Sequence, residues 1–322
     1  TYRRAYDTLA EGFGPGFNAP LTIALDAGDG NTITIDELTA VHNAVRTVPT
    51  IAFVTEPILN RAGDTAVLTA FPTTSPSSPQ TEDLVRNLRT EILPTATASS
   101  GLDTYVTGNT PAFIDISDKL SDRLPIFIAA VVGLSFLLLM VVFRSIVVPA
   151  KAAIMNLLSI GAAYGVVVAV FQWGWGNEII GVDTTVPISP FLPMMMFAIL
   201  FGLSMDYEVF LLSRIREEHL RSGDNHHSVV VGVAATARVI TSAALIMISV
   251  FAAFMLSPDI EVKMFAVGLT VAVLVDATIV RMILVPSTMA IMGNANWWLP
   301  SKLEAILPPV SYTHLPSPRD ST

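Results

Sequence analysis

The chain changes character near residue 122, from short mixed segments to long apolar runs. Residues 1–122 carry most of the acidic side chains and no apolar run long enough to cross a membrane. Five mostly apolar runs follow, and a hydrocarbon core needs about 20 such residues. They lie near residues 124–143, 149–171, 190–213, 231–256 and 264–291. The pattern predicts a soluble module joined to an α-helical bundle that crosses the membrane about five times.

The soluble module alternates between strand-like and helix-like segments. Apolar patterning predicts four strands, at residues 19–27, 50–59, 65–71 and 103–108. Apolar positions three and four apart predict two helices, at residues 35–48 and 80–93, with Thr34 and Thr81 as N-caps. The resulting order, βαββαβ, is typical of the ferredoxin-like fold. We therefore expect an α+β domain before the membrane bundle.

Composition supports a membrane protein and excludes several other classes. Hydrophobic residues make up 52% of the 322 residues and charged residues 14%, with a mean hydropathy of +0.60, whereas soluble domains carry about 25% charged residues. The formal net charge of −9 offers no basic field for nucleic acid. The sequence has no cysteine, and its five histidines show no metal-binding spacing. We therefore predict no cofactor, no metal site and no nucleic-acid partner.

Charges in the loops predict how the chain crosses the membrane. The loops around residues 143–151 and 214–227 contain Lys and Arg, which predicts a cytoplasmic location. This orientation places residues 1–122 outside the cytoplasm and residues 293–307 at the cytoplasmic interface. Residues 308–322 are polar and proline-rich, and we interpret them as a disordered or foreign tail. No signal-peptide pattern opens the chain, which indicates a truncated chain or a fragment of a longer gene.

The third apolar run contains an acid that is costly to place in a membrane. A carboxylate near the bilayer centre costs roughly 2.5–3.5 kcal/mol on insertion scales, which favours a functional role for Asp206. Tyr207 follows it directly, and Gly202 lies one helical turn earlier on the same face. Because Gly202 has no side chain, we expect a neighbouring helix to approach the acid there. Gly161 and Gly165 form a GxxxG pattern in the second run, which predicts another close helix contact.

The fourth and fifth runs supply candidate partners for that acid. Arg238, Thr241 and Ser242 share one face of the fourth run at helical spacing. This polar stripe is the expected partner. The fifth run adds Asp276 and Arg281, so the bundle contains acids and bases that can neutralise one another.

Two interpretations of these charges compete. A buried ion-pair network would only fix helix packing. An acid whose ionised form is disfavoured by burial and favoured by a nearby cation can instead carry a proton. We interpret Asp206, Tyr207 and Arg238 as a proton relay, and we interpret the charged pair of the fifth run as packing. Glu208 should lie nearer the interface and reach Arg214 or water.

Three apolar segments carry a resemblance to a known family. The segments are FGLSMDYEVFLLSRIREE, ARVITSAALIMISVFAAF and VLVDATIVRMILVP. Together with stretches upstream, they resemble the MMPL branch of the resistance-nodulation-division (RND) transporters over about residues 3–307. The resemblance implies that the chain is the second half of such a protein, without its first helix. It also implies that Asp206 and Tyr207 match the family's proton-relay pair.

The resemblance further implies a function, a location and partners. The whole protein would export lipids or other hydrophobic molecules by proton antiport, and it would not be an enzyme. It would lie in a bacterial plasma membrane, with the soluble module as an extracytoplasmic porter domain. Its partners would be membrane lipids, the hydrophobic substrate and the missing N-terminal half, and it could form a homo-oligomer. The fragment alone should not transport.

Two other functions fit part of the same pattern. An intramembrane aspartyl protease needs two membrane acids, and Asp206 with Asp276 could form that dyad. Arg238 and Arg281 balance these acids, which argues against a protease. A sterol-sensing-like receptor or scaffold would reuse the fold without transport. The intact pair of Asp206 and Tyr207 argues against that function.

Overall fold

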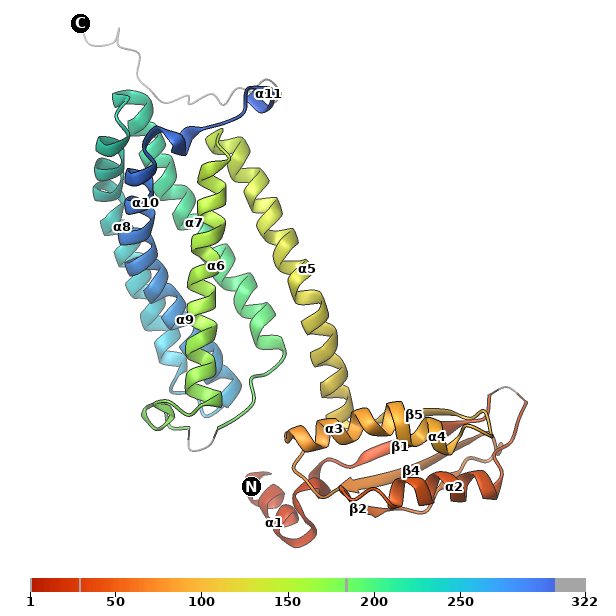
Figure 1. The fold of residues 1–322 in the computed structure, drawn as a ribbon. Helices are drawn as coiled ribbons and strands as arrows, with labels where there is room; N and C mark the ends of the chain where they lie inside the picture. The colour runs from red at the N-terminus through yellow and green to blue at the C-terminus, as the bar shows by residue number, and fades with distance from the viewer. Residues whose placement is uncertain (1, 29, 183–184, 305–322) are drawn as a thin grey trace, which may run out of the picture. The chain divides into compact units, whose positions relative to one another are not determined.

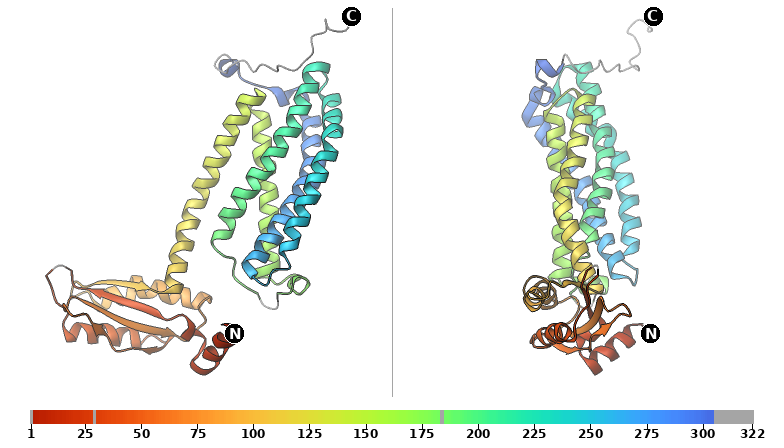
Figure 2. Two further views of the ribbon diagram at one scale, coloured as in Figure 1. Left: turned by 180° about the vertical axis from the view of Figure 1, so that it is seen from behind. Right: turned by 90° about the vertical axis from the view of Figure 1, so that its right-hand side faces the viewer.

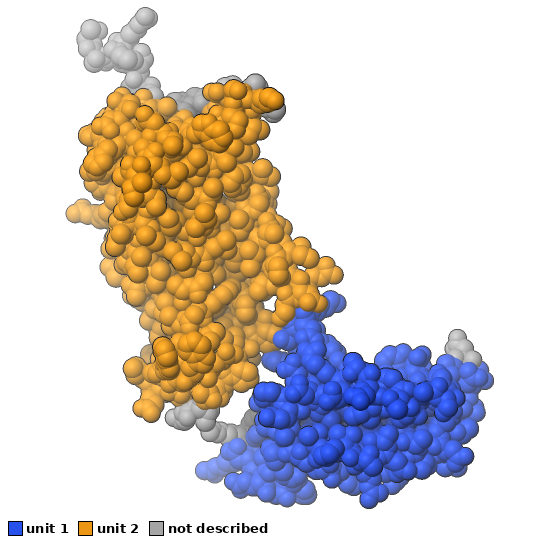
Figure 3. Space-filling model, viewed as in Figure 1, with its two compact units in different colours: residues 1–119 blue, residues 120–322 orange. Residues whose placement is uncertain are grey.

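The computed structural model describes most of the chain, namely residues 2–28, 30–182 and 185–304. The chain divides into two compact units, residues 1–119 and residues 120–322 (Figure 3). The division falls close to the change of pattern near residue 122. The predicted tail at residues 308–322 lies outside the described residues.

The first unit is an antiparallel sheet with helices between its strands (Figure 1). Its strands are β1 (Leu21–Asp26), β2 (Ile51–Val54), β3 (Ile58–Leu59), β4 (Thr65–Pro72) and β5 (Asp103–Thr107). Its helical segments are α1 (Tyr2–Phe13), η1 (Pro15–Asn18), α2 (Ile35–Arg46), α3 (Pro79–Asn87), η2 (Leu88–Ile92) and α4 (Leu93–Ala96). The strands lie in the order β2-β4-β1-β5, every pair is antiparallel, and β3 pairs with β4. This arrangement confirms the ferredoxin-like prediction.

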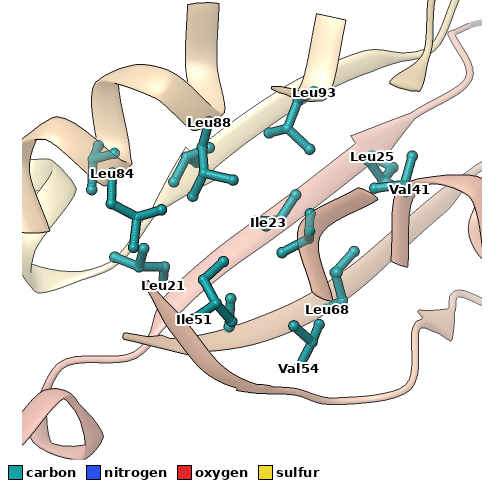
Figure 4. Close-up of a cluster of buried hydrophobic side chains, with 14 of the residues drawn as sticks. Leu21, Ile23, Leu25, Val41, Ile51, Val54, Leu68, Leu84, Leu88 and Leu93 are labelled. Carbon is teal, nitrogen blue, oxygen red and sulfur yellow. The ribbon is translucent and has the colours of Figure 1, made fainter. Parts of the chain in front are cut away.

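Alternate side chains of the sheet form the core of this unit. In β1, Leu21, Ile23 and Leu25 are fully buried, whereas the residues between them are half-buried. Val41 of α2 and Leu88 of η2 belong to the same cluster (Figure 4). Burying a side chain of this size contributes about 1.5–3 kcal/mol. The period of two in β1 therefore decides which face of the sheet the helices cover.

The two main helices of this unit begin at polar caps, and one cap differs from the prediction. Thr34 caps α2 as predicted. Its Oγ1 accepts from the backbone N–H of Glu37 at 3.3 Å, and the Glu37 carboxylate accepts from the backbone N–H of Thr34 at 2.7 Å. The N-cap of α3 is Ser78, so the prediction of Thr81 is wrong. Pro79 lacks an N–H and fits the first helical position, so the helix begins earlier and Thr81 is buried in its first turn.

The second unit is a bundle of long helices (Figures 1 and 2). The long helices are α5 (Asn109–Phe143), which begins in the first unit, α6 (Val147–Val167) with η3 (Val168–Gln172), α7 (Phe191–Ser222), α8 (Asn225–Phe254), and α9 (Ile260–Val275) continued by η5 (Asp276–Leu284) and α10 (Val285–Met292). The short segments are η4 (Asn177–Ile180), η6 (Gly293–Trp297) and α11 (Ser301–Glu304). Five helices of the described chain are long and apolar enough to cross a membrane, which confirms the predicted five spans.

Glycines mark close helix contacts, but not at the predicted positions. A Cβ at Gly232 of α8 would come within 2.5 Å of Ile215 Cγ1 on α7, and a Cβ at Gly268 of α9 would overlap another α7 side chain. These two glycines therefore let α8 and α9 approach α7. A Cβ would meet no described atom within 4 Å at the three glycines that the sequence singled out, Gly161, Gly165 and Gly202. The predicted close contacts at those three positions are thus not formed by the described helices.

A hydrogen-bonded cluster around Asn296 closes one end of the bundle. Ser145 Oγ donates to Asn296 O at 2.6 Å, and Asn296 Nδ2 donates to Met289 O at 2.7 Å. Asn225 Nδ2 donates to the same Met289 carbonyl at 2.9 Å, and Trp297 Nε1 donates to Asn225 Oδ1 at 3.2 Å. Asn296 is fully buried. The cluster fastens η6 to the starts of α6 and α8.

Candidate functional site

A buried ion pair lies in the interior of the bundle. Arg281 Nε and Nη2 donate to Asp276 Oδ2 at 2.8 Å and 2.6 Å. Both residues belong to η5, and both are buried. Each charge is therefore neutralised by the other inside the bundle, and such pairs need close geometry to offset the cost of desolvation.

The π-helical geometry of η5 explains how these two residues meet. In an α-helix, side chains five residues apart point about 140° away from each other. In a π-helix, the backbone bonds connect residues five apart, so these residues lie above one another. The π-helical segment runs for 9 residues, from Asp276 to Leu284. It places the guanidinium of Arg281 over the carboxylate of Asp276.

Three neutral side chains extend the ion pair into a network. Ser204 Oγ of α7 lies 2.6 Å from Asn156 Oδ1 and 3.1 Å from Asp276 Oδ2, and it accepts from Arg281 Nη2 at 2.9 Å. Ser159 Oγ of α6 donates to Asp276 Oδ1 at 3.4 Å. All three neutral residues are buried. The network therefore ties α6 and α7 to η5 through polar contacts in an otherwise apolar interior.

Glu208 belongs to this network, and the expectation that it reaches Arg214 or water is wrong. The residue is 5% exposed. Its carboxyl hydrogen-bonds with Asn156 and interacts electrostatically with Lys151 and with both members of the ion pair. Arg214 pairs instead with Glu217, at 2.7 Å. Glu208 lies one helical turn after the serine of the network, which places both on the inner face of α7.

Tyr207 borders the network next to a small cavity. Arg281 Cζ lies 5.4 Å from the centre of the Tyr207 ring, and the tyrosine hydroxyl lies 3.9 Å from Met247 Sδ. The cavity has a volume of about 20 Å³, and Ser159, Asp276, Arg281 and Tyr207 contribute to its lining. Arg281 Nη1 is buried and donates to no described protein atom. The cavity is large enough for a water molecule.

Asp206 lies on the outer side of α7, away from this network. Its side chain is exposed, as is Gly202 one turn earlier. No hydrogen bond or ion pair joins Asp206 to another described residue. Successive residues of an α-helix turn by about 100°, so Asp206 points away from both Ser204 and Glu208. The described helices leave this acid uncovered.

The polar stripe of α8 is also on the outside of the bundle. Arg238, Thr241 and Ser242 are all exposed. The expected pair between Arg238 and Asp206 is not formed. An aspartyl dyad is not formed either, because Asp276 is held in its buried ion pair while Asp206 is exposed. In the described part of the chain, no three His, Cys, Asp or Glu side chains converge as metal ligands would.

Sequence reasoning missed four members of the network, and a weak signal pointed to them. They are Lys151, Asn156, Ser159 and Ser204. Asn156 and Ser159 are three residues apart in an apolar run, a spacing that puts both on one helix face. A search for neutral polar residues in apolar runs, and not only for charged ones, would have identified this face of the helix as a candidate site. The pattern cannot say which face of the helix is the inner one.

Comparison with known proteins shows one consistent relationship. The profile of the MMPL family matches residues 21–306. The chain is 41% identical over 308 residues to membrane protein YdfJ of Bacillus subtilis (strain 168), covering 96% of this chain and 42% of that protein. It is 37% identical over 317 residues to the mycolic acid-containing lipids exporter MmpL11 of Mycolicibacterium smegmatis, covering 96% of this chain and 33% of that protein. It is 36% identical over 207 residues to the trehalose monomycolate exporter MmpL3 of the same species, covering 64% of this chain and 20% of that protein.

The match extends over both units of the chain. It includes the ferredoxin-like sheet, the helix that carries Asp206 and Tyr207, and the π-helical segment with its ion pair. The chain spans less than half the length of these relatives. It is a multi-pass membrane protein by its five apolar helices. The chain belongs to the MMPL family of the RND transporter superfamily, as its resemblance in sequence predicted.

Proposed function

We propose that this chain is part of an exporter that uses the proton gradient to move lipids or other hydrophobic molecules across the plasma membrane. In this proposal, Asp206 and Tyr207 relay the proton and unit 1 is the extracytoplasmic porter domain. The observation that carries the proposal is the exposure of Asp206 on the flank of an apolar helix. Two relatives named as lipid exporters support the class of substrate.

Lipid is an unfavourable environment for the exposed side chain of Asp206. An ionisable side chain within a membrane segment faces a protein interior or a water-filled cavity almost without exception. The neighbouring helix α8 presents Arg238, Thr241 and Ser242 in the same exposed state. Hydroxyl and guanidinium groups gain little from hydrocarbon contact, so this surface also favours a protein partner.

We propose that the partner is another part of the same protein. The chain covers 42% of one relative and 33% of another, so those proteins contain further sequence of comparable or greater length. A second bundle of helices from that sequence would enclose Asp206, with Tyr207 beside it on α7. Arg238 would then compensate the ionised carboxylate, and protonation of the acid would change how strongly the two bundles attract each other.

The test is Asp206→Asn in the full-length protein that carries this chain. Asparagine keeps the size of the side chain and removes its proton, so proton-coupled export should be lost while membrane insertion and abundance stay unchanged. Export is measured in cells and in proteoliposomes with an imposed pH gradient. The matched control is Glu217→Gln, an exposed acid of the same helix that pairs with Arg214.

Two results would contradict the proposal. Export by the Asp206→Asn variant at the wild-type rate would remove the acid from the relay. A wild-type protein that binds a hydrophobic ligand but never moves it, with or without a proton gradient, would favour the receptor or scaffold.

A further inference from the structure

We propose that Glu208 is a second proton-binding carboxyl of the bundle and that Lys151 is its counter-charge. The role in export rests on the proposed function, whereas the binding of the proton does not. The site is separate from Asp206, which lies on the other side of α7. Its ligand is a proton, taken up inside the bundle by a buried carboxyl.

The surroundings of Glu208 include several charged and polar groups. It is 5% exposed, and its carboxyl hydrogen-bonds with Asn156. Lys151 from α6 and the ion pair of Asp276 and Arg281 from η5 are the charged groups that act on it. The only Asp, Glu, Lys or Arg side chain of α8, Arg238, is exposed on the outside of the bundle.

The balance of charge ties Glu208 to Lys151. Asp276 and Arg281 neutralise each other at hydrogen-bond distance, so Lys151 is the cation left to balance Glu208. An unbalanced charge in a low-dielectric interior is strongly disfavoured. The site is therefore neutral when Lys151 is an ammonium and Glu208 a carboxylate. When the site takes up a proton, an O–H bond forms on Glu208 and an O–H bond of the donating hydronium ion breaks. The positive charge of the pair then remains on Lys151, which is only half-buried.

The hydrogen-bond chain connects this site to the buried ion pair. Ser204 Oγ has one proton and two acceptors in reach, Asn156 Oδ1 at 2.6 Å and Asp276 Oδ2 at 3.1 Å. The Ser204 hydroxyl can donate this proton to only one acceptor at a time. A change at Glu208 alters the hydrogen bonds of Asn156, and the serine hydroxyl can then turn toward Asp276.

Lys151 connects the same site to the end of the bundle. Its Nζ donates to Asn296 Oδ1, in the cluster that fastens η6 to α6 and α8. A lysine has three donors on a flexible stem, so it can hold this contact while Glu208 gains or loses a proton. The structure thus contains a series of polar side chains from the end of the bundle to Asp276, in which Lys151 and Glu208 interact electrostatically and the other neighbours hydrogen-bond.

The experiment measures protonated carboxyl groups directly by infrared difference spectroscopy of the full-length protein in liposomes as the pH is lowered. A protonated carboxylic acid has a C=O stretch that the carboxylate lacks. We expect Glu208→Gln to lose one component of the wild-type difference spectrum. Glu217→Gln, an exposed acid of the same helix, should keep that component. An unchanged spectrum in Glu208→Gln would overturn the proposal.

A second variant keeps the test informative if Glu208→Gln fails to fold. Lys151→Met removes the counter-charge, so Glu208 should keep its proton to a higher pH and its component should appear at a higher pH than in the wild type. A component that titrates as in the wild type would also overturn the proposal. Asp206→Asn separates this inference from the proposed function, because it should abolish export and leave the Glu208 component in place.

Discussion

Replacing Arg281 with Met tests the central energetic claim about the bundle. The change removes the guanidinium whose Nε and Nη2 hold Asp276 Oδ2 at 2.8 Å and 2.6 Å, and it keeps an unbranched apolar side chain. Asp276 is then a buried acid without its cation. Breaking a buried pair in this way costs about 3–5 kcal/mol. We expect the free energy of unfolding of the bundle to fall by that amount.

The measurement is a denaturant titration of the full-length protein in mixed micelles, followed by tryptophan fluorescence. All four tryptophans of this chain lie in unit 2, so within this chain the signal reports the bundle. The double variant Asp276→Leu with Arg281→Met removes both charges and should cost less than Arg281→Met alone, because apolar replacements of a whole buried pair are often neutral.

An exposed pair of the same bundle provides the control. Arg214 and Glu217 have side chains that are 54% exposed, so Arg214→Met should cost no more than about 1 kcal/mol. The reasoning fails if Arg281→Met also costs less than about 1 kcal/mol. It fails equally if the double variant is as unstable as the two single variants added together.

Four further substitutions test helix packing and one N-cap. Gly232→Ala should cost about 1–3 kcal/mol, since the new methyl group overlaps α7, whereas Gly161→Ala has open space and should stabilise its helix by up to about 1 kcal/mol; the same titration measures both. Trp297→Ala should cost about 3–5 kcal/mol in that titration, because the indole stacks on a histidine and lies under an arginine of α7. Thr34→Ala should speed hydrogen exchange of α2 and cost about 0.5–2 kcal/mol. The hydrogen bonds of Thr34 lower the pKa of Glu37. The stabilisation of α2 by these bonds is therefore present above the unfolded pKa of the Glu37 carboxyl and is lost as the pH falls through its folded pKa. The difference in the hydrogen-exchange rate of α2 between the wild type and Thr34→Ala should therefore become smaller at acidic pH.

The features of the fold that depend on local pattern were predictable from the sequence. The period of two in β1 and the long apolar runs predicted the sheet and the five spans, because burial decides both. The start of α3 was missed, since Ser78 and Thr81 are both good caps and the proline between them decides where the helix begins.

The candidate site was predictable only in part. Helical spacing correctly put Arg238, Thr241 and Ser242 on one face, but a single helix does not reveal whether a polar face points inward. The sequence indicated that Asp276 and Arg281 could help neutralise the charges of the bundle. Their direct contact did not follow from α-helical spacing, because Arg281 meets Asp276 only through π-helical turns. The burial of Glu208 depends on residues of α6 far away in the sequence.

The π-helical turns of η5 also affect whether the sequence can tolerate the deletion of a residue. A residue added to or lost from an ordinary α-helix rotates everything after it by about 100°. A π-turn already holds extra residues, so a deletion there can be absorbed by a return to α-helical turns. Residues 285–297 would then keep their rotational phase, and the cluster around Asn296 would stay in register. The segment that carries the ion pair is therefore a place in this bundle where evolution can lose a residue without misaligning the helix beyond it.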